Sequence, residues 1–195
     1  MNKIYLSYLL LLIFVIGCKT LKPVGEMKQN TEQAQMSVTD PVSSETVFSD
    51  QSTWLLGYFT REQMYRTPHC VWYLNGYDNY KPDSLVVNKL TKIPVDVLTI
   101  KIVMGTWCPD SRREVPRFLH VLDLWKFPPE RVTFIGVDNA KLSPVGEYNM
   151  LDIQRVPTFI FYKNNIEAGR IIEVPVTSLE QDIVNILTKE WKIIN

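Results

Sequence analysis

The chain has 195 residues, and its 21 Lys and Arg residues balance its 21 Asp and Glu residues, so the formal net charge is zero. No block rich in Lys and Arg occurs, and the charge pattern of a nucleic-acid-binding protein is therefore missing. The two histidines, His69 and His120, are far apart and lack the spacing of metal ligands. We expect no metal site, no cofactor and no nucleic-acid partner.

Residues 1–17 have the pattern of a secretory signal peptide. Lys3 precedes an apolar run over residues 4–16, which is too short to span a membrane because a spanning helix needs roughly 20 apolar residues. Residues 15–18, Val-Ile-Gly-Cys, resemble the lipobox of bacterial lipoproteins, in which the cysteine becomes the lipidated first residue. This predicts lipidation of Cys18 and a lipid-anchored position in the bacterial cell envelope, facing the periplasm or the outside. The alternatives are an ordinary signal peptide with a coincidental cysteine, or an uncleaved anchor.

Residues 18–50 are mostly polar, with few aromatic or branched apolar side chains. Such a segment buries too little surface to fold, so we expect a lipid-anchored disordered tether. Residues 51–195 have the length of one folded domain.

The start of the expected domain, residues 54–80, is unusually aromatic and has poor periodicity. It predicts a helix over residues 52–64, followed by an irregular or second helical segment. Asp83 is a suitable N-cap for a short helix over residues 84–90.

Residues 96–104 are dense in Val, Leu, Ile and Thr, which predicts a strand covered on both faces. The apolar spacing over residues 111–125 predicts a helix, with Pro109 in its first turn and Pro116 kinking it. Residues 131–137 predict a second strand.

The C-terminal part begins with a polar stretch to Asp152 that we expect to contain a short helix. Residues 158–162 and 169–174 predict an antiparallel hairpin around Asn164-Asn165. Thr177 and Glu180 form a capping-box pattern ahead of an amphipathic helix that reaches Ile194. The order of elements predicts an α/β fold with a mixed central sheet and helices on both faces.

Cys108 follows the strand over residues 96–104 and precedes the helix over residues 111–125. A cysteine at a helix start faces unpaired backbone N–H groups and the positive end of the helix dipole, which favour thiolate over thiol. The second cysteine that redox sites usually carry three residues later is Ser111 here, so the motif is C-x-x-S with one sulfur.

Together, Trp107-Cys108-Pro109, Pro116, Arg155-Val156-Pro157-Thr158 and the terminal helix resemble the thioredoxin superfamily over most of residues 84–195. The aromatic region before Tyr80 is then an N-terminal elaboration. The resemblance implies that Pro157 is cis and lies against Cys108, and that Val156 offers its backbone to an extended substrate. Trp107, Pro109 and Arg155 complete the expected substrate-binding residues. The alternative is that Val-Pro-Thr merely begins a strand.

Two departures from the family pattern affect the same step, the release of the mixed disulfide. Ser111 replaces the resolving cysteine, and Ile102 stands where many thioredoxins have a buried carboxylate that assists proton transfer. Cys108 can therefore form a mixed disulfide, but it has no partner three residues away to release it. Cys70, the other remaining thiol, is expected to be buried and inert, with a Cys70–Cys108 partnership as the alternative.

The leading hypothesis is an envelope thiol-disulfide exchange protein with Cys108 as nucleophile and Ser111 as its hydrogen-bonding neighbour, a reductase or isomerase whose partners are protein thiols or disulfides or a small thiol. The alternative is a redox-inactive binding module that holds extended segments in the groove beside Pro157. Whether the chain is an enzyme stays open. A peroxidase and a copper-delivery protein are weaker readings, because the motifs of neither are present.

Overall fold

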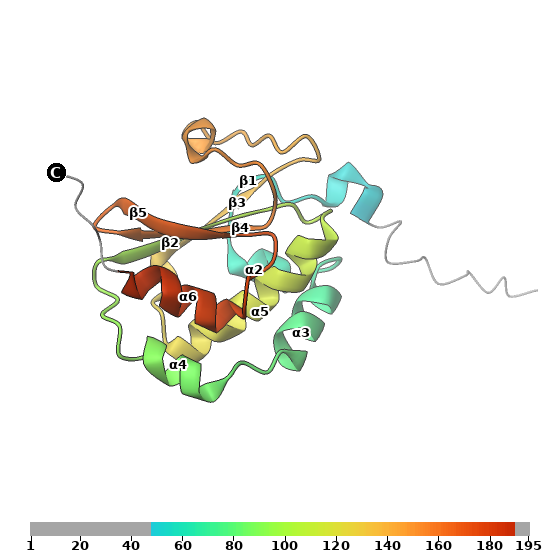
Figure 1. Ribbon diagram of the computed structural model, residues 1–195. Coiled ribbons are helices and arrows are strands. Elements are labelled where there is room, and N and C mark those ends of the chain that lie inside the picture. Colours follow the sequence, from blue (N-terminus) through green and yellow to red (C-terminus); the bar gives the residue numbers. More distant parts are fainter. Residues whose placement is uncertain (1–47, 190–195) are drawn as a thin grey trace, which may run out of the picture. The chain divides into compact units, whose positions relative to one another are not determined.

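The computed structural model describes residues 48–189, and the predicted signal peptide, Cys18 and most of the tether lie outside these residues. In chain order the elements are η1 (Gln51–Thr53), β1 (Gly57–Phe59), α2 (Arg61–Met64), α3 (Cys70–Asn79), α4 (Ser84–Leu90), β2 (Leu98–Met104), α5 (Pro109–Trp125), η2 (Pro129–Arg131), β3 (Val132–Gly136), η3 (Tyr148–Leu151), β4 (Thr158–Lys163), β5 (Ile166–Ile172) and α6 (Leu179–Thr188) (Figure 1).

The five strands form one mixed sheet in the order β1-β3-β2-β4-β5. β2 lies in its centre, parallel to β3 and antiparallel to β4, while β1 and β5 add antiparallel edges. The register pairs Ile102 of β2 with Phe134 on one side and Phe159 on the other. The predicted α/β class, the mixed sheet and the C-terminal hairpin are thereby confirmed.

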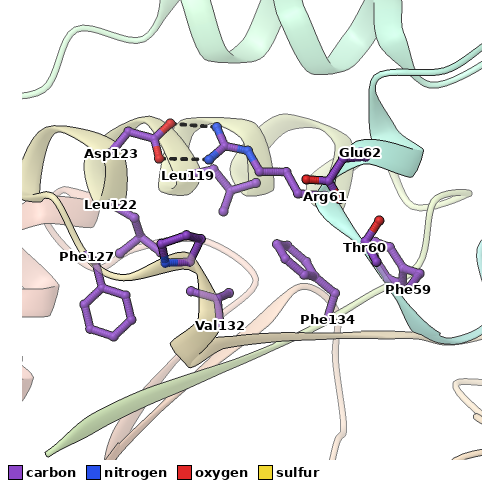
Figure 2. Close-up of a pocket in the computed structure, with 11 residues that line it drawn as sticks. Phe59, Thr60, Arg61, Glu62, Leu119, Leu122, Asp123, Phe127, Val132 and Phe134 are labelled. Carbon is purple, nitrogen blue, oxygen red and sulfur yellow. Dashed lines mark hydrogen bonds and ion pairs between the residues drawn. The ribbon is translucent and has the colours of Figure 1, made fainter. Parts of the chain in front are cut away.

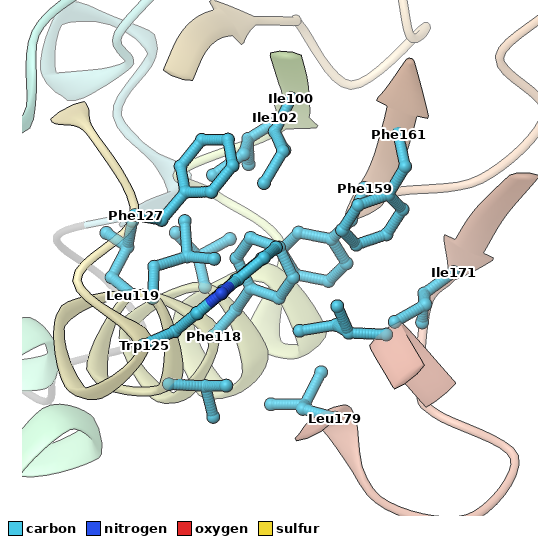
Figure 3. Close-up of a cluster of buried hydrophobic side chains, with 14 of the residues drawn as sticks. Ile100, Ile102, Phe118, Leu119, Trp125, Phe127, Phe159, Phe161, Ile171 and Leu179 are labelled. Atoms are coloured by element: carbon cyan, nitrogen blue, oxygen red, sulfur yellow. The ribbon is translucent and has the colours of Figure 1, made fainter. Parts of the chain in front are cut away.

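One face of the sheet carries the larger core, and every α-helix that contributes to this core packs on that face (Figure 1). Figure 3 shows its centre, where Phe118 of α5 stacks on Phe159 of β4 with ring centroids 4.1 Å apart. Ile100 and Ile102 reach the same cluster from β2 because alternate residues of a strand point to the same face. This packing fixes α5 across the sheet.

The opposite face carries a smaller cluster that includes Val103, Ile135 and Ile160 and is covered by Tyr148 and Leu151 of η3. The prediction of helices on both faces therefore holds only in part, because this face has a single 3₁₀ turn and no α-helix among residues 48–189. The segment between β3 and β4 contains Pro144 and Gly146, two residues that oppose α-helix formation.

The predicted helix over residues 52–64 is wrong. The segment instead forms η1, the edge strand β1 and the four-residue α2. Gly57 has a φ of 71°, which interrupts helical geometry, and β1 gains its hydrogen bonds by pairing with β3. Pairing with a strand far along the chain overrides the local pattern here.

Helix starts follow the sequence more closely. Asp83 caps α4 by accepting a hydrogen bond from the N–H of Leu85, as predicted. The N-cap of α6 is Ser178 rather than the predicted Thr177, and its hydroxyl accepts from the N–H of Gln181. Glu180 instead accepts from the Tyr80 hydroxyl at 2.8 Å, which ties α6 to the end of α3.

α5 runs from Pro109 to Trp125 with Pro116 inside it, as one α-helix. Pro116 lies against Gly76 of α3, where an added Cβ would come 2.5 Å from the proline ring. The absence of a side chain at Gly76 therefore lets α3 and α5 cross closely. No helix within residues 48–189 is long and apolar enough to span a bilayer.

Gly136, at the end of β3, gives a test of how the chain before β1 is held. A Cβ at this position would lie 1.9 Å from the carbonyl oxygen of Leu55, whereas a Cβ at exposed Gly146 would meet nothing within 4 Å. We expect Gly136→Ala to lower the free energy of unfolding by about 1–3 kcal/mol through overpacking. Gly146→Ala is the matched control and should stay within about 0.5 kcal/mol of wild type in urea denaturation. Equal effects of the two changes would contradict this packing.

Candidate functional site

Cys108 is the N-cap residue of α5 and is 7% exposed. Its N–H donates to the Gly105 carbonyl at 2.9 Å, and its carbonyl accepts from the N–H of Arg112 at 3.0 Å. The thiol donates to the Val156 carbonyl, with Sγ 3.3 Å from the oxygen. The fold thus brings together two predicted site residues that are 48 positions apart in the sequence.

The loop that faces Cys108 contains the cis peptide Val156–Pro157, the geometry that the resemblance implies. Val156 and Pro157 are buried, and the Pro157 carbonyl accepts from the N–H of Glu173 at 2.7 Å. Arg155 is exposed and forms an ion pair with Glu173 at 2.8 Å. The loop between β5 and α6 therefore binds the Val156–Pro157 loop through Glu173.

Trp107 and Pro109 flank the thiol. The Trp107 indole donates to the Val137 carbonyl at 2.9 Å and packs near Trp54, with ring centroids 6.2 Å apart. Pro109 is exposed in the first turn of α5, where a missing N–H costs no hydrogen bond. Of the predicted substrate-binding residues, Pro109 and Arg155 are exposed, Trp107 is half-buried, and Val156 and Pro157 are buried.

Ser111 is fully buried, and its hydroxyl oxygen accepts a hydrogen bond from the N–H of Gly105 at 3.3 Å. Among the described residues the thiol of Cys108 bonds to Val156 and not to Ser111. Ser111 in this arrangement holds the turn between β2 and α5, which is the turn that positions Cys108.

The sequence reasoning did not find the segment that packs beside this turn. The N–H of Leu55 donates to the hydroxyl of buried Thr106 at 3.2 Å, and the Trp54 indole donates to the Phe48 carbonyl at 2.9 Å. Arg112 donates to the carbonyls of Thr106 and Trp107, and its guanidinium lies 4.2 Å from the centroid of the Phe48 ring. The high density of aromatic residues before Tyr80 was the feature of the sequence that could have indicated this packing.

His69 packs against the same segment, through Phe48. It is 3% exposed, stacks on Phe48 at 6.1 Å between ring centroids, and meets Trp72 edge-on at 5.9 Å. Its Nδ1 atom has no hydrogen-bond partner among the described residues. The pKa of the imidazole is lowered, mainly by burial. A hydrogen bond with the Thr53 backbone opposes this in part, and the charge of Arg112 adds to the lowering.

Cys70 begins α3 and is only partly buried, so the expectation of a buried residue is wrong. Cys70 and Cys108 are both free thiols, and no disulfide joins them. No group of three or more His, Cys, Asp or Glu side chains within residues 48–189 has the arrangement of a metal site.

A cavity of about 230 Å³ lies between β1, α2 and α5, away from Cys108 (Figure 2). At its rim Arg61 binds both carboxylate oxygens of Asp123, at 2.8 and 2.7 Å. The hydroxyl of Tyr77 donates to the same carboxylate at 2.6 Å. These partners hold the pKa of Asp123 below its ordinary value despite partial burial. Arg61 and Asp123 are already paired with each other, which indicates a structural role for these two residues.

Comparison with protein-family models gave no match, and no curated protein matches the sequence. Among solved structures, the chain is similar to a protein of unknown function from Pseudomonas aeruginosa, with 14% identity, a TM-score of 0.42, and coverage of 60% of this chain and 78% of that one. An HIV epitope scaffold gives 14% identity, a TM-score of 0.41, and coverage of 60% and 79%.

Oxidised thioredoxin O2 from Arabidopsis thaliana is a third similar structure. It has 21% identity and a TM-score of 0.36, and the match covers 55% of this chain and 91% of the thioredoxin. All three TM-scores are below 0.5, so none of these structures supports an argument about function.

The buried imidazole of His69 predicts a pH-dependent stability. Its pKa is lower in the folded chain than in the unfolded one, so the unfolded state binds the proton more readily. The contribution of His69 to stability is complete above the unfolded pKa of about 6.5 and is lost progressively below it, by at most about 1.4 kcal/mol per pH unit.

Urea denaturation between pH 7.5 and 5.5 measures this dependence. The slope of unfolding free energy against pH should be smaller in His69→Phe, which keeps a ring against Phe48 and removes the titrating group. An identical slope in the variant and the wild type would contradict the assignment to His69.

Proposed function

We propose that the chain is a thioredoxin-like thiol-disulfide exchange protein of the cell envelope that acts through the single nucleophile Cys108. The observation that carries the proposal is the thiol at the N-terminus of α5, facing the Val156–Pro157 loop at 3.3 Å. The sheet order and the position of Trp107 and Pro109 around the thiol support it. The thiolate is the reactive form of a cysteine in such an exchange.

The exchange begins when Cys108 loses its thiol proton to solvent. The thiolate attacks one sulfur of a disulfide R–S–S–R′, a bond forms between Sγ and that sulfur, and the original S–S bond breaks. The group R′–S⁻ leaves and takes up a proton. The product is a mixed disulfide of Cys108 with R, formed without net oxidation or reduction.

Release of Cys108 needs a second thiol, because position 111 is serine. When a second cysteine of the substrate attacks the mixed disulfide, the substrate regains a disulfide and Cys108 leaves as thiolate, which is isomerisation. When a small external thiol attacks, R is passed to that thiol. A second external thiol then frees R, so two external thiols are oxidised for each disulfide reduced.

The burial of the thiol favours a second candidate function. Cys108 is 7% exposed and its S–H is already bonded to Val156. A substrate sulfur must displace this contact before it reaches Sγ. The alternative is therefore a redox-inactive module that binds extended segments beside Pro157, with Trp107, Pro109 and Arg155 at the rim.

The discriminating experiment compares exchange by the Cys18→Ala, Cys70→Ala chain with exchange by the same chain carrying Cys108→Ser or Ser111→Cys in addition. Cys108→Ser should abolish formation of mixed disulfides and refolding of scrambled ribonuclease, because no other residue of the site supplies a thiolate. Ser111→Cys should gain insulin-reduction activity over the Cys18→Ala, Cys70→Ala chain, because the new thiol releases the mixed disulfide.

Cys70→Ala alone is the control and should retain the activity of the wild type. Slow alkylation of Cys108 together with inactivity of Ser111→Cys would overturn the exchange function and leave the binding module. Mass spectrometry of the trapped mixed disulfide supplies the identity of R.

We also propose that lipid on Cys18 anchors the chain in the envelope, which gives it access to envelope proteins with thiols or disulfides. The basis is the apolar run over residues 4–16 followed by Gly17-Cys18. Labelled palmitate should enter the wild-type protein in cells and not the Cys18→Ala variant, and globomycin should leave the precursor uncut. A mature protein that lacks Cys18 would contradict the anchor.

A further inference from the structure

A groove of about 810 Å³ lies between β5 and α6, which pack against each other (Figure 1). β5 is the last strand of the sheet, so its outer edge has no strand partner among residues 48–189. Asp182, Ile186 and Lys189 line the groove from one side of α6, because residues three or four positions apart share a helix face. The other lining residues are Arg170, Ile171, Ile172, Val174, Val176, Thr177, Asn185 and Thr188.

The groove exposes a short apolar surface. Of the side chains that line it, Ile172 is 45% exposed, Val174 is 48% exposed and Val176 is 93% exposed. The carboxylate of Asp182 is already used, since it accepts from the N–H of Val176 at 2.6 Å and from that of Thr177 at 3.2 Å. Exposed apolar side chains that lie together mark an interaction surface. These three side chains are therefore the part of the lining that a partner would bury.

The helix beside the groove ends earlier than the sequence predicts. The apolar spacing predicts a helix that reaches Ile194, but the last residue of α6 is Thr188. Lys189 has a φ of −55° and a ψ of 125°, which lie outside the helical region, so the chain leaves the helix axis there. Because Lys189 also lines the groove, the chain departs from the helix at the groove itself.

Residues 190–195, Glu-Trp-Lys-Ile-Ile-Asn, come next and lie outside the described residues. Three of these six residues are apolar, Trp191, Ile193 and Ile194. Six residues of extended chain span at most about 20 Å, whereas the ten residues of α6 span about 15 Å. A segment that turns back at Lys189 is therefore long enough to reach along the whole of α6. In an extended segment Trp191 and Ile193 point to the same side.

We propose that residues 190–195 bind in the groove between β5 and α6, with Trp191 as the main apolar anchor. A large aromatic side chain gains more than most from leaving water. Attachment at Lys189 gives the segment a high effective concentration at the groove, so a small contact area is sufficient. The inference does not depend on the exchange function.

The proposed contact lies against the loop that binds the Val156–Pro157 loop. Ile172 and Val174, which the segment would cover, flank Glu173 in the sequence. The N–H of Glu173 donates to the Pro157 carbonyl at 2.7 Å. The proposed segment therefore packs on the side chains next to this hydrogen bond.

Photo-crosslinking in the full-length chain locates the segment. Trp191 is replaced by the photoreactive aromatic residue p-benzoylphenylalanine, the protein is irradiated, and the linked peptides are identified by mass spectrometry. We expect a link within one chain from position 191 to residues 170–176, which come from β5 and the loop after it. Residues 170–176 are the diagnostic target because links to the end of α6 follow from the chain connection alone.

A pair of charged substitutions tests whether this link depends on the groove. Val174→Lys together with Val176→Lys should lower its yield at least threefold, because an ammonium group resists burial under apolar side chains. The matched control is Val71→Lys together with Leu85→Lys. These two side chains are 75% and 73% exposed and do not line the groove, so the yield should stay unchanged.

Urea denaturation supplies a second measurement without the photoreactive residue. Trp191→Ala should raise the equilibrium constant for unfolding about tenfold, because a partly buried indole is lost. Lys192→Ala is the control and should change this constant by less than about twofold. In the chain with Val174→Lys and Val176→Lys, Trp191→Ala should have an effect of less than about threefold, because the contact is already broken.

Three results overturn the inference. One is a link from position 191 that is confined to residues outside 170–176, and another is an equal loss of yield in the control pair. The third is a product that joins two chains, which assigns the groove to a second copy of the protein. A tenfold effect of Trp191→Ala that persists in the Val174→Lys, Val176→Lys chain also contradicts it, because Trp191 then packs elsewhere.

Discussion

The contact between the Cys108 thiol and the Val156 carbonyl is the point on which the site depends. The central strand β2 ends in the turn that carries Cys108, and the adjacent antiparallel strand β4 begins directly after Pro157. The C-terminal end of β2 and the N-terminal end of β4 therefore lie at the same end of the sheet, where Sγ lies 3.3 Å from the Val156 oxygen. The large aromatic core under α5 fixes this geometry, because it sets the helix against both strands.

Three polar contacts then hold the turn before Cys108 in shape. Ser111 accepts from the N–H of Gly105, Thr106 accepts from the N–H of Leu55, and Arg112 donates to the Trp107 carbonyl. Buried backbone groups need such partners because an unpaired one costs free energy. The serine of the C-x-x-S motif thus helps to hold the turn in shape, which is a structural role for this residue.

Much of the fold was predictable where the chain carries its own local signals. Three local signals were each sufficient to predict an element: the apolar run before Cys108 for β2, the apolar spacing for α5, and Asp83 for the start of α4. The strand that contains Gly57 could not be predicted. β1 forms by pairing with β3, and the local periodicity of the sequence does not indicate a distant strand partner. Arg112, Phe48 and His69 meet through tertiary packing alone, so the sequence indicated their aromatic and basic character but not their position.

The burial of Cys108 bears on how a substrate of the proposed exchange would reach the thiol. A thiol that is 7% exposed and bonded to Val156 is reached only by a substrate that approaches along a defined path. Binding energy gained away from the sulfur can offset the cost of opening the thiol contact. For the proposed exchange function, a single buried sulfur therefore favours selective exchange over general disulfide reduction.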